Sequence, residues 1–278
     1  MSRLIFEPNV RIIGATGFAA GAIQSWAEDH DVLHLVNDPT TPLGRICQDI
    51  RDIKVSSLDL MPEFAGRFCY RAWTKGRGLD EYIKNVIESG HGSVLEHSNV
   101  TFSITGVSRS FSHELVRHRQ GVAISQESQR YVDAKDVKFV VPPLMLGFRS
   151  KPGYINGIHA MTNWFVEQYQ ALQVVLENEA KLYGWSGTDL KKRVNEAARC
   201  VLPNMTETRL TWTANLRALR HICSLRGSPH ADLEIRRWAV IVTAMMKKAA
   251  PHVFADFKIM PSLYENIPDT VETAFPKV

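Results

Sequence analysis

Charged and polar side chains gather in one stretch of the chain, Arg117–Tyr131, without any apolar periodicity. It opens with Arg117, His118 and Arg119 and closes with Ser128, Gln129, Arg130 and Tyr131. Guanidinium groups bind phosphate or carboxylate through paired, planar hydrogen bonds and keep their charge near neutral pH. The stretch is therefore a candidate anion-binding site. A solvated basic helix end followed by a polar loop would have the same composition.

Metal and nucleophile chemistry fit the sequence less well. The histidines and glutamate of Ser89–His97 have no tetrahedral zinc spacing, and His113 and His118 are too far apart for an HExxH helix face. Ser128 has no base at a fixed spacing, so we assign it a binding role. Cys200 has no activating neighbour in the sequence. We predict no metal site and no covalent nucleophile.

Composition limits the class of protein. The chain has 278 residues, 45% hydrophobic and 22% charged, with 33 basic against 29 acidic side chains. A formal net charge of +4 does not demand a nucleic-acid partner. No apolar run is long enough to span a membrane, and the first residues do not form a signal peptide. Four cysteines without a CxxC pair favour free, mostly buried thiols, so we expect a cytoplasmic protein.

Alternating strands and helices predict one α+β domain over residues 1–278, with a central, largely antiparallel sheet flanked by helices. We expect strands at 10–14 (the first), 99–105, 137–141 and 209–214. Helices are expected at 18–26, 79–88, 154–183, 190–201, 216–226 and 231–249. A further helix, capped by Ser108 or Ser110, would deliver Arg117 at its end.

Other segments give weaker or different signals. Asp38 to Gly44 is expected to be a loop, no element is assigned between Ile46 and Phe68, and 259–278 is expected to be an irregular tail. The apolar stripe of the longest helix, which includes Met161 and Trp164, is interpreted as core.

Four blocks between roughly residues 80 and 240 resemble the flavin-dependent thymidylate synthases. In that family Arg-His-Arg precedes Ser-x-Arg-Tyr, usually by seven residues, whereas eight intervene here, Gln120 to Glu127. The other blocks are Gly90–His97, Ala198–Pro203, and Asn215–Arg226 with His230–Arg237. The region around 38–75 would hold an insertion relative to the family's usual length.

The resemblance implies that FAD is bound by His91, Ser93, Arg117, His118, Arg119, Asn215, Arg217 and His221. The substrate nucleotide would be held by Glu114, Gln126, Glu127, Ser128, Gln129, Arg130, Arg199 and Arg226, with Arg199 reaching it across a subunit boundary. Arg226 and His91 would be catalytic. Arg226 would lie against the pyrimidine and stabilise negative charge there.

The implied reaction is the reductive methylation of dUMP to dTMP in a homotetramer with shared sites. Methylenetetrahydrofolate would donate the carbon and NADPH-reduced FAD the hydride. Family members commonly carry glutamine at the position of Glu114. This difference and the extra residue leave open a flavin- and folate-dependent methylase or hydroxymethylase acting on another base, such as dCMP. A nucleic-acid-binding module that uses the Arg-His-Arg segment is the more distant alternative.

Overall fold

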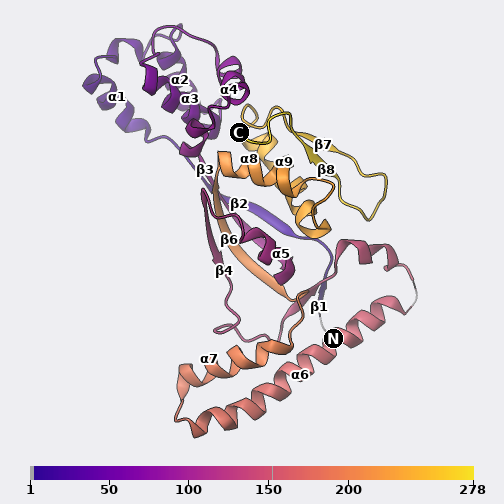
Figure 1. The fold of residues 1–278 in the computed structure, drawn as a ribbon. Helices are drawn as coiled ribbons and strands as arrows, with labels where there is room; N and C mark the ends of the chain where they lie inside the picture. The colour runs from indigo at the N-terminus through magenta and orange to yellow at the C-terminus, as the bar shows by residue number, and fades with distance from the viewer. Residues whose placement is uncertain (1–2, 152) are drawn as a thin grey trace.

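The computed structural model describes residues 3–151 and 153–278. A four-stranded sheet lies at the centre of the molecule, with helices at both ends and over one face (Figure 1). Its strand order is β2 (Asn9–Ala15), β3 (Asn99–Ser108), β6 (Glu207–Asn215), β4 (Val122–Gln126). Every neighbouring pair is antiparallel, which confirms the predicted sheet in part: β4 was not predicted, and the strand expected at 137–141 lies outside this sheet.

Alternation along these strands places large apolar side chains on one face. Phe102 of β3 lies opposite Trp212 of β6, and their ring centroids are 5.7 Å apart. Trp212 meets Trp238 edge-on at 5.3 Å, and Trp238 in turn meets Phe111 at 5.6 Å. Because Phe111 and Trp238 belong to α5 (Arg109–Leu115) and α9 (Leu233–Ala249), these two helices are fixed on the same face of the sheet.

The helices of the amino-terminal region form one end of the molecule (Figure 1). They are α1 (Ala20–Asp29), η1 (Leu33–Leu35), α2 (Pro42–Asp52), α3 (Ser57–Tyr70) and α4 (Leu79–Glu88). The loop prediction for Asp38 to Gly44 is wrong in part, because Thr41 caps α2 by accepting a hydrogen bond from the Gly44 N–H at 3.1 Å. The unassigned region from Ile46 to Phe68 is ordered as the rest of α2 and most of α3.

The strand predicted at 10–14 is confirmed as β2, but it is not the first, because β1 (Arg3–Ile5) precedes it. β1 pairs in parallel with β5 (Lys138–Val140) in a separate small sheet, and η3 (Pro143–Phe148) follows. The predicted strand at 137–141 is confirmed as β5. The strands at 99–105 and 209–214 are also confirmed, with longer bounds.

A pair of helices, α6 (Tyr154–Leu182) and α7 (Gly187–Ala198), projects at the end opposite α1–α4 (Figure 1). The short η4 (Arg199–Val201) follows α7. The core interpretation of the α6 stripe is wrong in part: Tyr169 is buried, but Met161 and Trp164 are 42% and 53% exposed. Within the described residues, α6 packs mainly against α7 and η4.

The predicted helices at 216–226 and 231–249 are confirmed as α8 (Leu216–Arg226) and α9. The tail is more ordered than expected, because β7 (Lys258–Met260) and β8 (Thr270–Glu272) form a hairpin and Val271 is buried.

All four cysteines are free, and only Cys47 and Cys223 are buried. Within the described residues, none of the helices has the length and apolar character needed to cross a membrane.

Candidate functional site

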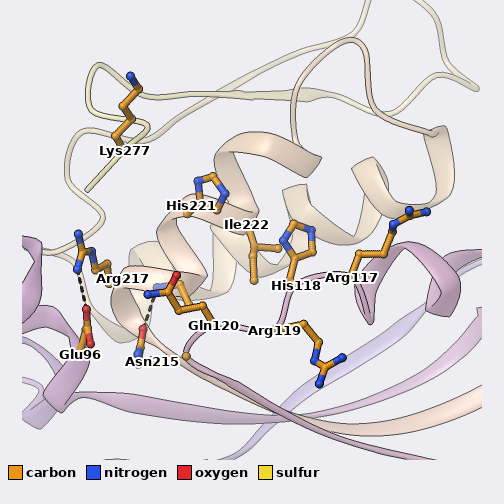
Figure 2. A pocket seen from close by; sticks show the side chains of 12 residues that line it. Glu96, Arg117, His118, Arg119, Gln120, Asn215, Arg217, His221, Ile222 and Lys277 are labelled. Atoms are coloured by element: carbon orange, nitrogen blue, oxygen red, sulfur yellow. Dashed lines mark hydrogen bonds and ion pairs between the residues drawn. The ribbon is translucent and has the colours of Figure 1, made fainter.

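A cavity of about 480 Å³ opens where the segment after α5 meets the amino-terminal half of α8 (Figure 2). It is lined by Glu96, Arg117, His118, Arg119, Gln120, Gly121, Asn215, Arg217, Ala218, His221, Ile222 and Lys277. We call it the large cavity. Segments about a hundred residues apart in the chain therefore supply one concave, cationic surface.

Helix caps position both walls of the large cavity. Ser108 begins α5, and its hydroxyl accepts a hydrogen bond from the Phe111 N–H at 3.0 Å, as expected for one of the two candidate capping serines. Asn215 begins α8 by accepting from the Ala218 N–H at 2.8 Å. Gly121 connects the walls: its carbonyl accepts from the Asn215 N–H, its φ is +69°, and a Cβ there would lie 2.5 Å from the Asn215 side chain.

Six of the residues predicted to bind a flavin nucleotide line the large cavity together: Arg117, His118, Arg119, Asn215, Arg217 and His221. His91 and Ser93 are exposed and outside its lining, at the start of η2 (Gly92–His97). They lie beside it, because a Cβ on the intervening Gly92 would come within 3.0 Å of the Arg217 Nε. The roles assigned to all eight residues stay predictions.

Hydrogen bonds and an ion pair join Arg226 of α8 to the end of α5. The Arg226 Nε donates to His118 Nε2 at 2.9 Å, its Nη2 donates to the Glu114 carbonyl at 3.2 Å, and its Nη1 pairs with the Glu114 carboxylate. Burial, followed by the charge of Arg226 and the proximity of His221, lowers the pKa of His118 to about 4. His118 is thus neutral at neutral pH and accepts the hydrogen bond from Arg226.

The loop predicted to hold the substrate is tied to the sheet and to α7. The Gln126 amide donates to Ser112 and Thr208 at 3.0 and 2.9 Å. Arg130 forms an ion pair with Glu196 at 2.7 Å, and its backbone N–H donates to the Ser128 hydroxyl. Both Gln126 and Arg130 therefore already have protein partners. The Glu127 backbone likewise bonds to Arg209.

A smaller cavity of about 340 Å³ lies between α5 and α7 and contains two more predicted substrate residues. It is lined by Arg109, His113, Gln129, Glu196, Arg199, Cys200, Leu202, Pro203 and Asn204. The pKa of Arg109 is lowered by burial and by the positive charge of Arg199 nearby. Two neighbouring guanidinium groups of like charge favour an anion between them. Arg199 and Gln129 thus share one cavity, separate from the contacts of Arg226.

Sequence reasoning missed several of the lining residues. Arg109 and His113 are four residues apart on α5, so they share a helix face, and that spacing was the available signal. Glu96 lies in a recognised block and pairs with Arg217 at 2.7 Å. Gln120 follows Arg119 directly, whereas Lys277 gave no signal in the sequence.

Arg220, which the sequence groups with Arg217 and Arg226 on one helix, does not belong to either cavity. It is 1% exposed and forms an ion pair with Asp256 at 2.7 Å. It also donates to the carbonyl groups of Val253 and Val278. Arg220 thus holds the carboxyl-terminal segment against α8.

Known proteins share both the sequence and the fold of this chain. The family described as thymidylate synthase complementing protein matches residues 55–252. A flavin-dependent thymidylate synthase of Mycobacterium sp. (strain JLS) is 45% identical over 204 residues, 72% of this chain and 80% of that protein. One from Mycobacterium avium (strain 104) is 46% identical over 202 residues, 71% and 78% of the two chains.

Among solved structures, the UMP/dUMP methylase PolB from Streptomyces cacaoi, bound with 5-Br UMP, has a TM-score of 0.60 at 22% identity. The similarity covers 92% of this chain and 96% of PolB, so the two share a fold. The matched stretch and the mycobacterial relatives place the chain in the thymidylate synthase complementing protein family, to which flavin-dependent thymidylate synthases belong.

Proposed function

We propose that this protein is a flavin-dependent thymidylate synthase that converts dUMP to dTMP, with methylenetetrahydrofolate as carbon donor and NADPH as reductant. The observation that carries the proposal is the large cavity, where six residues expected to bind flavin meet from two distant segments. The donor set fits a flavin dinucleotide, since Arg117, Arg119 and Arg217 can hold phosphate oxygens and Asn215 and His221 can bind polar edges. When bound, FAD would supply the redox chemistry of the reaction.

In this proposal the residues of the chain bind, orient and stabilise charge. Arg226 acts as a fixed, permanently charged donor aimed at the negative charge that develops on the pyrimidine. Its guanidinium is held from two sides by Glu114 and by neutral His118, so its direction is set before the substrate arrives. Arg109 and Arg199, which share the smaller cavity, are suited to the phosphate of the nucleotide.

A homotetramer is part of the proposal. Apolar side chains of α6 and the turn after it are exposed: Met161, Trp164, Val174, Val175, Leu182, Tyr183 and Trp185. Exposed apolar side chains along a projecting helix pair are typical of a protein–protein interface. The smaller cavity lies at the base of the same pair, so a second copy packed there could contribute to it.

The free cysteines support a cytoplasmic location of the protein.

The partner of Arg226 favours considering a second substrate. The Glu114 carboxylate, which stands where the family commonly has glutamine, is paired with the guanidinium expected to face the pyrimidine. A pyrimidine that offers a different pattern of donors and acceptors, such as that of dCMP, could suit this pair.

The visible absorption spectrum of the purified protein, followed by titration with dUMP and separately with dCMP, tests the proposal. We expect a flavin band that dUMP perturbs and dCMP does not. Perturbation by dCMP alone would retain the cofactor and change the substrate. Absence of flavin after addition of FAD, together with avid, salt-dependent DNA binding, would instead favour a nucleic-acid-binding module.

A further inference from the structure

The carboxyl-terminal segment contributes a side chain to the large cavity. Residues after 252 lie beyond the stretch that the family match covers. Lys277 nevertheless lines the cavity together with Arg217 and His221. In Figure 2 it stands on a loop at the rim, above Arg217. The segment that carries it comes from neither of the two walls described above.

Buried hydrogen bonds fix the backbone on both sides of Lys277. The Arg220 Nε donates to the Val278 carbonyl at 3.0 Å, and its Nη2 reaches the Phe275 carbonyl at 3.5 Å. Asp256, which pairs with the same guanidinium, also accepts from the Thr273 hydroxyl. Arg220 is almost fully buried, and its bond to the Val278 carbonyl is shielded from water. The position of Lys277 is therefore set by the core.

Val278 packs directly beneath the site. It is 8% exposed, and a Cβ added to Gly92 would lie 3.3 Å from its Cγ1 and 3.0 Å from the Arg217 Nε. The segment thus closes against η2 and the first turn of α8 at one point. Lys277, the preceding residue, is held at the Arg217 end of the large cavity.

A phosphate bound at the Arg217 end of the large cavity would need a further positive charge there. Arg217 is paired with Glu96 at 2.7 Å, so the two together carry no net charge. A phosphate that approached Arg217 would also meet the Glu96 carboxylate. Lys277 adds a positive charge beside this pair. An ammonium on a flexible stem can reach toward a phosphate oxygen as a point charge.

We propose that Lys277 is a phosphate-binding residue of the large cavity, contacting a phosphate of the bound nucleotide cofactor. This rests on the proposed function, and FAD is the expected ligand because the other lining residues suit it. NADPH carries phosphate groups as well, and the two sources are separated below.

The experiment compares Lys277→Ala and Lys277→Arg with the wild type, with Lys258→Ala as the matched control. Lys258 is an exposed lysine of β7 in the same carboxyl-terminal region and lines neither described cavity. The dissociation constant of FAD is measured by quenching of flavin fluorescence on the apoprotein at low and high salt. The dependence of turnover on NADPH concentration and the melting temperature of each apoprotein are measured in parallel.

We expect Lys277→Ala to weaken FAD binding about fivefold at low salt and less at high salt. Lys277→Arg and Lys258→Ala should stay close to the wild type, with unchanged apoprotein melting temperatures. A raised KM for NADPH with unchanged FAD binding would keep the phosphate contact and assign it to NADPH. If the wild type binds FAD and Lys277→Ala alters neither ligand, the inference is overturned. A wild type that binds no FAD overturns the proposed function and this inference with it.

Discussion

The large cavity and the smaller cavity are both lined by arginines, but they differ in what holds those arginines. One wall of the large cavity follows α5, which Ser108 caps, and the other is α8, which Asn215 caps. Both capping residues end strands of the central sheet. On the substrate side, Arg130 is paired with Glu196, and Arg226 with Glu114. Arg199 lies beside Arg109 in the smaller cavity, whose lining includes Glu196 but neither Arg226 nor Glu114. The cofactor wall is thus gathered within one chain, whereas the predicted substrate contacts are divided between separate places.

This difference indicates where a second copy of the chain matters. Six of the predicted flavin residues line the large cavity within a single chain. Arg199 and Arg226 do not share a cavity in one chain. If both arginines hold one nucleotide, as we propose, they have to be brought together. Variants of these two arginines are therefore the sharpest way to test the comparison.

The largest effect is expected from Arg226→Ala. Loss of a fixed donor aimed at developing negative charge should reduce turnover by about 10²–10³-fold. FAD binding should persist, because Arg226 is not in the lining of the large cavity. Steady-state turnover and the flavin spectrum measure the two quantities. Arg51→Ala, which removes an exposed guanidinium on α2, is the control. Undiminished turnover in Arg226→Ala would remove Arg226 from the reaction.

The sequence could predict those elements whose apolar residues follow a regular local spacing. The helix at 79–88 and the strand at 99–105 follow from regular apolar spacing, and both are in the structure. α2 was missed because proline and glycine suggest a loop, although proline directly after Thr41 is also a favoured helix start. α3 contains Pro62 and buries Glu63. Charges hidden inside a fold break the apolar pattern by which a helix is recognised.

Burial of Glu63 is possible only because of long-range pairing that a sequence does not display. Its carboxylate accepts from Arg67 at 2.8 Å and is paired with Arg45 of the preceding helix. Paired charges of this kind avoid the cost of an isolated buried ion. The apolar stripe of α6 is the opposite case, in which apolar side chains are exposed. An apolar helix face predicts burial but does not tell which chain covers it. Trp164 remains exposed in the single chain.

Site residues were predictable where a recognisable block carried them. Arg117 and Asn215 were found in this way and meet in one cavity. Arg109 and Lys277 have no such signature, because their position depends on how α5 and the segment after β8 pack. Their roles come from three-dimensional proximity alone.

An intermediate effect is expected when two inactive variants are mixed. If Arg199 of one copy completes the site that contains Arg226 of another, Arg199→Ala and Arg226→Ala chains should complement each other. After co-expression in equal amounts, turnover should recover to roughly a quarter of the wild-type value, because one site in four would carry both intact arginines. Turnover of each variant alone is the control. No recovery in confirmed mixed oligomers would place both arginines of a site on the same chain.

The smallest effect is expected from the protonation of His118. The folded protein holds its pKa at about 4, below the ordinary 6.5, through burial and then through the charge of Arg226. The unfolded chain therefore binds this proton first as pH falls. The stability due to neutral His118 is complete above about pH 6.5 and is lost progressively toward pH 4.

Chemical denaturation of the wild type and of His118→Asn over this pH range measures the contribution. The wild type should lose more stability than the variant between pH 6.5 and pH 4, and the two should run parallel above that range. NMR titration of the histidine rings gives the pKa directly. In Arg226→Ala the pKa of His118 should rise but stay below 6.5, because burial, the larger cause, remains. A normal pKa in the wild type would mean that His118 does not accept a hydrogen bond from Arg226 in solution, and the guanidinium would then be oriented by Glu114 alone.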